Sequence, residues 1–178
     1  MMVSRRTLLK QLAVFSAGIV LAPSLAGCNS KPSPLYKNIV VTDEQDELLA
    51  LISETIIPKT NTPGAKDTEV HEYCIKMIDD CLSKEDQKKW LKGLAEFNAL
   101  SEKNNKKDFS SMDSAERVKF LTELNESKAE DDVNFFYEAT KHFTLRGYTT
   151  SEYYMTTVQN YQMIPGKFKG CVPVTNPS

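Results

Sequence analysis

Apolar residues recur along most of the chain at the spacing of an α-helix. The first run follows Thr42, which can form a capping box with Gln45 and so satisfy free backbone N–H groups at a helix start. It stops at Pro58, which cannot donate a backbone hydrogen bond. Its apolar positions are Leu48, Leu49, Ile52 and Ile56. The pattern predicts a first helix over residues 43–57.

Three further runs share this period. A second helix is predicted over residues 67–82, and two helix caps, Ser83 with Asp86 and Asp113 with Glu116, predict a third and a fourth helix. The residues expected to face inward are Val70, Cys74, Met77, Ile78 and Cys81 in the second helix, Trp90, Leu91, Leu94 and Phe97 in the third, and Val118, Leu121 and Leu124 in the fourth.

A fifth helix is predicted over residues 131–146, with Gly147 ending it. Thr150 or Ser151 then begins a short helix toward Val158. The inward positions of the fifth helix are Val133, Phe136, Ala139, Thr140 and Phe143.

The predicted fold class is therefore all-α, a small helical domain of about five to six helices with an irregular C-terminal tail. No part of the sequence predicts a β-sheet of any size. Residues 101–108 are highly charged and are predicted to form a solvated loop. The tail contains Pro165, Gly166, Pro173 and Pro177.

The first 28 residues have the order of a targeting segment rather than of a fold. Arg5 and Arg6 precede an apolar stretch over residues 12–25 and resemble a twin-arginine signal, in which a translocase receptor reads the arginine pair. The sequence Leu25-Ala26-Gly27-Cys28 resembles a lipobox, in which the Cys28 thiol takes up a diacylglycerol. We therefore expect an exported, periplasmic lipoprotein that a lipid on Cys28 anchors to the membrane.

The alternative for this segment is a membrane-spanning anchor. The apolar run is shorter than the ~20 residues that a spanning helix needs, and Gly18 and Pro23 interrupt it. The expected organisation is a signal peptide over residues 1–27, a tether over 28–41 and a helical domain over 42–178.

Composition excludes one class of partner. The chain has 22 basic and 24 acidic residues, and the predicted signal peptide removes three basic residues and no acidic one, which leaves a net charge of −5. An acidic domain disfavours nucleic acid as a partner.

The sequence contains few residues that point to catalysis. It has two histidines, and it lacks the spacings typical of zinc sites, covalently bound haem, dinucleotide-binding folds and phosphate-binding loops. His71 and Glu72 are adjacent, which permits a metal or acid/base pair, but a partly exposed helix histidine is the more common case. For His142 we expect a core or partner-facing position. We expect no catalytic, metal-binding or cofactor-binding residue in this chain.

Export would place the cysteines in an oxidising compartment, where disulfides persist. Cys74 and Cys81 are seven residues apart on one predicted helix, about 10.5 Å along its axis, which is too far for a disulfide. Cys171 is left to pair with one of them or with a cysteine of another subunit. The alternative is three free thiols, with Cys74 and Cys81 buried.

Aromatic residues are denser near the C-terminus than one small helical core needs. Tyrosines in excess near a loop-rich end are typical of a protein interface. The cluster comprises Phe135, Phe136, Tyr137, Phe143, Tyr148, Tyr153, Tyr154 and Tyr161.

Several motifs together resemble the gluconate 2-dehydrogenase subunit 3 family. They are Ile56-Ile57-Pro58, Thr62-Pro63-Gly64-Ala65, Arg146-Gly147-Tyr148 followed by Ser151, Tyr161 to Gly166, and Gly170-Cys171. The resemblance implies a small, cofactor-free subunit of a periplasmic flavin-dependent sugar or sugar-acid dehydrogenase. In such a complex a large subunit binds FAD, and a cytochrome c subunit carries haem c.

Two functions are consistent with these features. In the first, the chain escorts the folded FAD subunit through the twin-arginine translocase and then anchors the complex to the membrane. In the second, it is a stand-alone exported lipoprotein that binds a small ligand or acts as an enzyme through His71, Glu72 or its cysteines.

Overall fold

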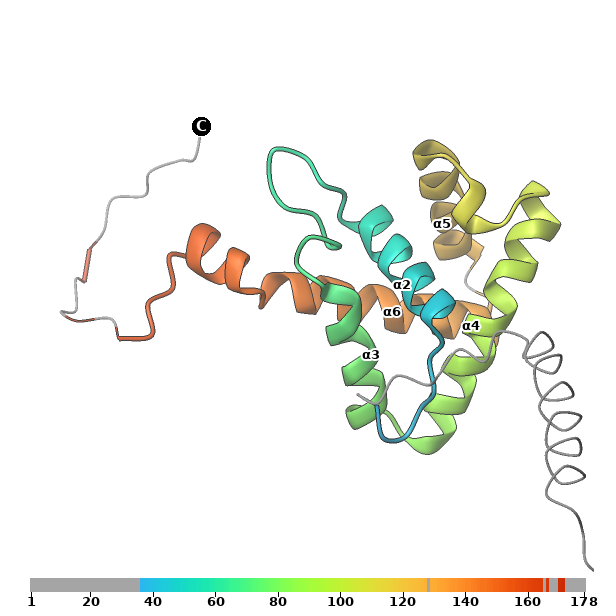
Figure 1. The fold of residues 1–178 in the computed structure, drawn as a ribbon, viewed down its shortest axis with the longest axis horizontal. Helices are drawn as coiled ribbons and strands as arrows, with labels where there is room; N and C mark the ends of the chain where they lie inside the picture. The colour runs from blue at the N-terminus through green and yellow to red at the C-terminus, as the bar shows by residue number, and fades with distance from the viewer. Residues whose placement is uncertain (1–35, 128, 165, 167–169, 172–178) are drawn as a thin grey trace, which may run out of the picture. The chain divides into compact units, whose positions relative to one another are not determined.

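The computed structural model of the chain describes residues 36–127, 129–164, 166, 170 and 171, all within one compact unit, Pro32–Ser178. Over these residues the chain forms helices and no strand, which confirms the predicted all-α class (Figure 1). In the described part of the chain, no helix has both the length and the apolar character needed to cross a bilayer.

The helix starts follow the capping residues. Thr42 and Gln45 form a reciprocal capping box at the start of α2, and the Ser83 hydroxyl accepts from the backbone N–H of Asp86 at the start of α4. The elements are α2 (Asp43–Ile56), α3 (Val70–Cys81), α4 (Lys84–Asn105), the 3-10 turn η2 (Phe109–Ser111), α5 (Ser114–Ser127), α6 (Asp132–Thr149) and the π-helical turn η3 (Tyr154–Val158).

Helix α6 is the centre of the bundle, because α2, α3, α4 and α5 all pack against it (Figure 1). The contact with α4 is the most extensive, and Gly93 makes it possible. A Cβ on Gly93 would lie 2.5 Å from the Cβ of Phe136 and would overlap the carbonyl oxygen of Asp132. The two helices therefore approach as closely as their backbones allow.

The core between these helices is aromatic. The ring of Phe97 lies 5.2 Å from Phe109, 5.5 Å from Phe120 and 5.4 Å from Phe136, measured between ring centroids. Edge-to-face pairs of this kind stabilise a core beyond the area that they bury. Phe109 comes from η2, an element that the helical periodicity does not predict.

Two predicted helix ends are wrong. Helix α4 extends to Asn105 through the first half of the predicted loop 101–108, because Ser101 is buried and its hydroxyl donates to the carbonyl of Lys107. Gly147 lies inside α6 and does not end it. A Cβ there would lie 2.7 Å from the Tyr73 ring, so the glycine permits close packing of α3 on α6.

Two predicted core positions are also wrong, because Cys81 and Val118 are exposed. Ile75 and Phe120, which were not predicted to face inward, are buried. Helix α3 begins at Val70 rather than at residue 67, because Glu69 adopts a left-handed conformation with φ of 52°.

Residues 36–41, which we call the strap, belong to the folded unit and not to a tether. Ile39 and Val41 are 3% and 2% exposed and lie in the core. The backbone N–H groups of Lys37, Asn38 and Ile39 donate to the carboxylate of Asp79 on α3 at 2.7–2.9 Å. The fold therefore includes residues that precede the expected boundary at residue 42.

Candidate functional site

The predicted site residues are distributed unevenly over the structure. Arg5, Arg6 and Cys28 lie outside the described residues. Cys171 is exposed and forms no disulfide with Cys74 or Cys81 in the part of the chain that the structure describes, so its bond to another subunit stays a prediction. Cys74 is buried, and burial raises the pKa of its thiol to about 12. A thiol with so high a pKa is a poor nucleophile.

The two histidines lie in separate surroundings. His71 Nε2 lies 3.9 Å from a carboxylate oxygen of Asp46, and its Nδ1 has no hydrogen-bond partner, while Glu72 is exposed. His142 is exposed rather than buried, with its ring 5.2 Å from that of Phe143. Among the residues described, no three His, Cys, Asp or Glu side chains are grouped as metal ligands.

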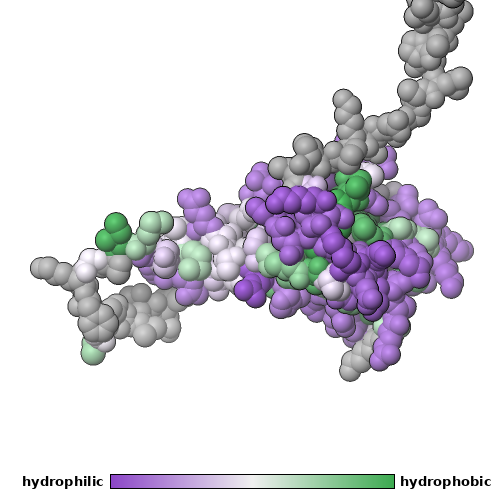
Figure 2. Space-filling model, turned by 90° about the horizontal axis from the view of Figure 1, so that it is seen from below, coloured by the Kyte–Doolittle hydropathy of each residue, from purple (hydrophilic) through white to green (hydrophobic). Residues whose placement is uncertain are grey.

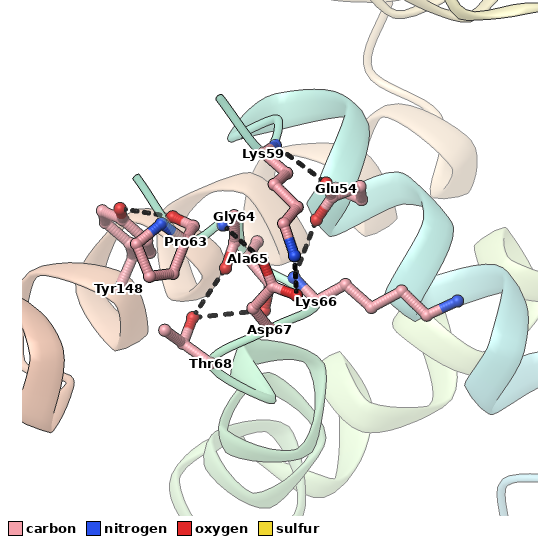
Figure 3. Close-up of polar contacts among 9 residues, drawn as sticks. All are labelled: Glu54, Lys59, Pro63, Gly64, Ala65, Lys66, Asp67, Thr68 and Tyr148. Atoms are coloured by element: carbon pink, nitrogen blue, oxygen red, sulfur yellow. Dashed lines mark hydrogen bonds and ion pairs between the residues drawn. The ribbon is translucent and has the colours of Figure 1, made fainter. Parts of the chain in front are cut away.

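Residues 57–69 join α2 to α3 and are held by an extensive set of hydrogen bonds; we call them the connector. Glu54, in the last turn of α2, accepts from the backbone N–H of Lys59 at 2.8 Å and from that of Lys66 at 2.9 Å (Figure 3). One carboxylate therefore holds both ends of the turn that contains Thr62-Pro63-Gly64-Ala65.

Asp67 closes the same turn from the other side. Its carboxylate accepts from the Lys59 ammonium at 3.0 Å and from the backbone N–H of Gly64 at 3.1 Å (Figure 3). These two bonds, the Lys59 bond first, lower the pKa of Asp67 below its ordinary value. The Thr68 hydroxyl adds a bond to the Gly64 carbonyl at 3.1 Å.

Gly64 is required here because there is no room for a side chain. A Cβ at this position would lie 2.6 Å from both a Glu54 carboxylate oxygen and the Lys59 backbone nitrogen. The Tyr148 hydroxyl, on α6, donates to the carbonyl of Pro63 at 2.8 Å (Figure 3). The connector is thus fastened to α2, to α6 and to itself, so that two of the quoted sequence motifs meet in space.

Two open hollows border the connector. One of about 420 Å³ is lined by Asp67, Thr68, Glu69, Ser151, Glu152, Tyr153 and Thr156. The other, of about 400 Å³, is lined by residues 59–63 together with Asp67, Thr68 and Tyr153. Tyr153 therefore lies between them, and the first hollow carries three carboxylates and no basic side chain.

A wider hollow of about 760 Å³ lies between α5 and the start of α6. Its lining includes Glu130, Asp131, Asp132 and Glu138, and the Lys89 ammonium lies over the Phe135 ring at 5.9 Å. It brings together no nucleophile with a base.

The described residues define a small all-α protein whose best-organised surface is a rigid connector beside an aromatic chain segment. The family model described as gluconate 2-dehydrogenase subunit 3 matches residues 43–166, and the chain belongs to this family. It is therefore a small subunit of a dehydrogenase complex. No curated protein and no solved structure matched the chain.

The connector's polar frame was not identified from the sequence, although part of it was recognisable. Asp67 follows Gly64 by three residues, the spacing at which the acidic or amide residue of a capping box bonds back to an earlier backbone N–H. Glu54 lies on the preceding helix and gives no such local signal.

Proposed function

We propose that the chain is the non-catalytic small subunit that escorts the FAD-containing large subunit through the twin-arginine translocase and then anchors the dehydrogenase, with its cytochrome c subunit, to the membrane on the periplasmic side. One observation carries the proposal, which is that a dehydrogenase-subunit domain follows Arg5-Arg6 and a sequence that resembles a lipobox ending in Cys28. The twin-arginine route exports folded proteins, and a flavoprotein must fold around FAD before export.

The strap supports an anchoring role. A lipid on Cys28 would pull on the strap, whose residues are bonded to Asp79 and buried through Ile39. Force on the anchor would therefore reach α3 directly.

The length of the tether limits where the domain can lie. Tyr36 lies eight positions after Cys28, and an extended chain spans at most about 3.5 Å per residue. The strap would thus lie within roughly 30 Å of the lipid.

The first test replaces Arg5 and Arg6 with lysine in the natural host, which keeps the charge and removes the recognised pair. We expect flavin-dependent dehydrogenase activity to leave the periplasmic face and accumulate in the cytoplasm. Lys10→Arg is the matched control in the same segment and should leave export unchanged. Continued export of the activity with the double variant would contradict the escort role.

The second test is Cys28→Ser, with Cys81→Ser as the control at an exposed thiol. We expect the dehydrogenase to move from the membrane to the soluble periplasmic fraction without losing export. Turnover, or a bound ligand, in the purified single chain would instead support the stand-alone alternative.

A further inference from the structure

The chain beyond α6 contains a segment that its own domain does not bury. We call residues 152–164 the arm. No residue of the arm is buried, and the exposed fractions are 48% for Val158, 54% for Tyr161 and 84% for both Met163 and Ile164. These four are among the seven large apolar side chains that are most exposed in the described part of the chain.

The exposed apolar residues are concentrated rather than scattered. Isolated apolar residues on a surface are normal, whereas a group of them marks an interaction site. Figure 2 shows a few hydrophobic side chains along the chain that leads out of the bundle, at the left of the view, while the bundle surface in this view is largely hydrophilic apart from a hydrophobic patch near its upper edge.

The base of the arm has a defined conformation. The Tyr154 N–H donates to the Ser151 hydroxyl at 3.3 Å, and the Tyr148 and Tyr154 rings lie 6.0 Å apart between centroids. Further out, the Tyr161 N–H donates to the Met155 carbonyl at 2.8 Å. A segment that is already ordered loses less entropy when it binds a partner.

The family match extends to residue 166 and so includes the arm. The arm is therefore part of the sequence that characterises these dehydrogenase subunits, yet it adds nothing to the core of its own domain. This combination is expected of a segment that serves the assembled complex.

We infer that the arm, together with the hollow beside the connector that is lined by Asp67, Glu69 and Glu152, is the docking surface for the FAD-containing subunit. This inference rests on the proposed function. Tyr161, Met163 and Ile164 would enter an apolar groove of that subunit, and basic side chains at the rim of the groove would face Glu69 and Glu152. A membrane surface is the less suitable occupant, because anionic lipids repel the carboxylates that line the hollow.

The test uses the full chain expressed with its dehydrogenase in the natural host. A photo-crosslinking amino acid is placed at Met163 or, as control, at Val118, which is 49% exposed on α5. We expect a crosslink from position 163 to the flavin-carrying subunit, identified by mass and by flavin fluorescence, and none from position 118. A crosslink from 163 to lipid alone, or to the flavoprotein only from 118, overturns the inference.

A second measurement uses the variant Met163→Asp with Ile164→Asp, and Val118→Asp as its control. Because these side chains are exposed, all variants should fold, which circular dichroism checks. We expect flavin that co-purifies with the chain to fall at least tenfold for the arm variant and to stay within twofold for the control.

Two outcomes separate this inference from the proposed function. If the arm variant retains its flavin while the wild type also co-purifies the flavoprotein, the docking surface is wrong and the proposed function stands. If the wild-type chain co-purifies no flavoprotein, both are wrong.

Discussion

The strap precedes the helices of the bundle in the chain and the arm follows them, and the two segments differ sharply in burial. Ile39 in the strap is 3% exposed and its N–H is bonded to Asp79, whereas Ile164 in the arm is 84% exposed. The same side chain is thus core at one end and surface at the other. The contrast indicates that the strap serves the fold, while the arm is available to a partner.

The largest effect on stability is expected for Asp79→Ala, which removes the carboxylate that holds the strap. It leaves three backbone N–H groups of the strap without an acceptor, and each lost bond costs about 1 kcal/mol. We expect the free energy of unfolding to fall by about 3 kcal/mol in urea titrations. Asp80→Ala, at an exposed neighbour, is the control and should change it by less than about 0.5 kcal/mol.

A comparison of Ile39→Ala with Ile164→Ala tests whether the buried isoleucine of the strap contributes more to stability than the exposed isoleucine of the arm. Truncating a buried isoleucine costs roughly 2–4 kcal/mol, whereas an exposed site changes stability by less than about 0.5 kcal/mol. Urea unfolding of the isolated subunit measures both. Equal losses would mean that the arm packs on its own domain.

The bonds between the strap and Asp79 should also stabilise the fold less at low pH. Burial raises the pKa of Asp79, but the N–H bonds from Lys37, Asn38 and Ile39 more than offset this, and the net pKa lies below the ordinary 3.8. The ionised carboxylate therefore stabilises the fold above the ordinary carboxyl pKa, and this contribution is lost as the pH falls through the lower value of the folded state.

Urea unfolding of the wild type and of Asp79→Asn at pH 7 and at about pH 3 measures this loss. The difference in the free energy of unfolding between the two proteins should be smaller at the lower pH. A difference that is independent of pH would mean that the Asp79 charge does not hold the strap. Asp80→Asn serves as the control.

Removing residues 159–178 should have the smallest effect. Because the described part of this segment is exposed, we expect the free energy of unfolding to change by less than about 0.5 kcal/mol. The change is measured by urea titration of the isolated subunit. A loss of several kcal/mol would show that the segment stabilises the domain itself.

Local signals in the sequence predicted the helices well. Thr42 with Gln45, Ser83 with Asp86, and Asp113 with Glu116 act within three residues of each other, and all three caps are present. The all-α class followed from them and from the apolar period. The family resemblance, drawn from separate motifs, is confirmed over residues 43–166.

Features that depend on distant partners were missed. Gly147 was predicted to end a helix because glycine commonly does so, but its role is set by Tyr73, which approaches from another helix. The strap was predicted to be a tether because nothing near Ile39 in sequence indicates Asp79, forty residues away. The bond between the connector and α6 could not be predicted for the same reason, since Tyr148 meets Pro63 only in the folded chain.

The central position of α6 has a consequence for timing during synthesis. Four earlier α-helices need α6 to complete their packing, and it is the last α-helix of the described chain. At about 5–20 residues per second, Arg6 leaves the ribosome roughly 7–29 s before Thr149. A translocase that accepted unfolded chains would have that interval to act on the proposed signal alone. One that waits for folded cargo leaves time for the bundle to close and for a partner to be collected first.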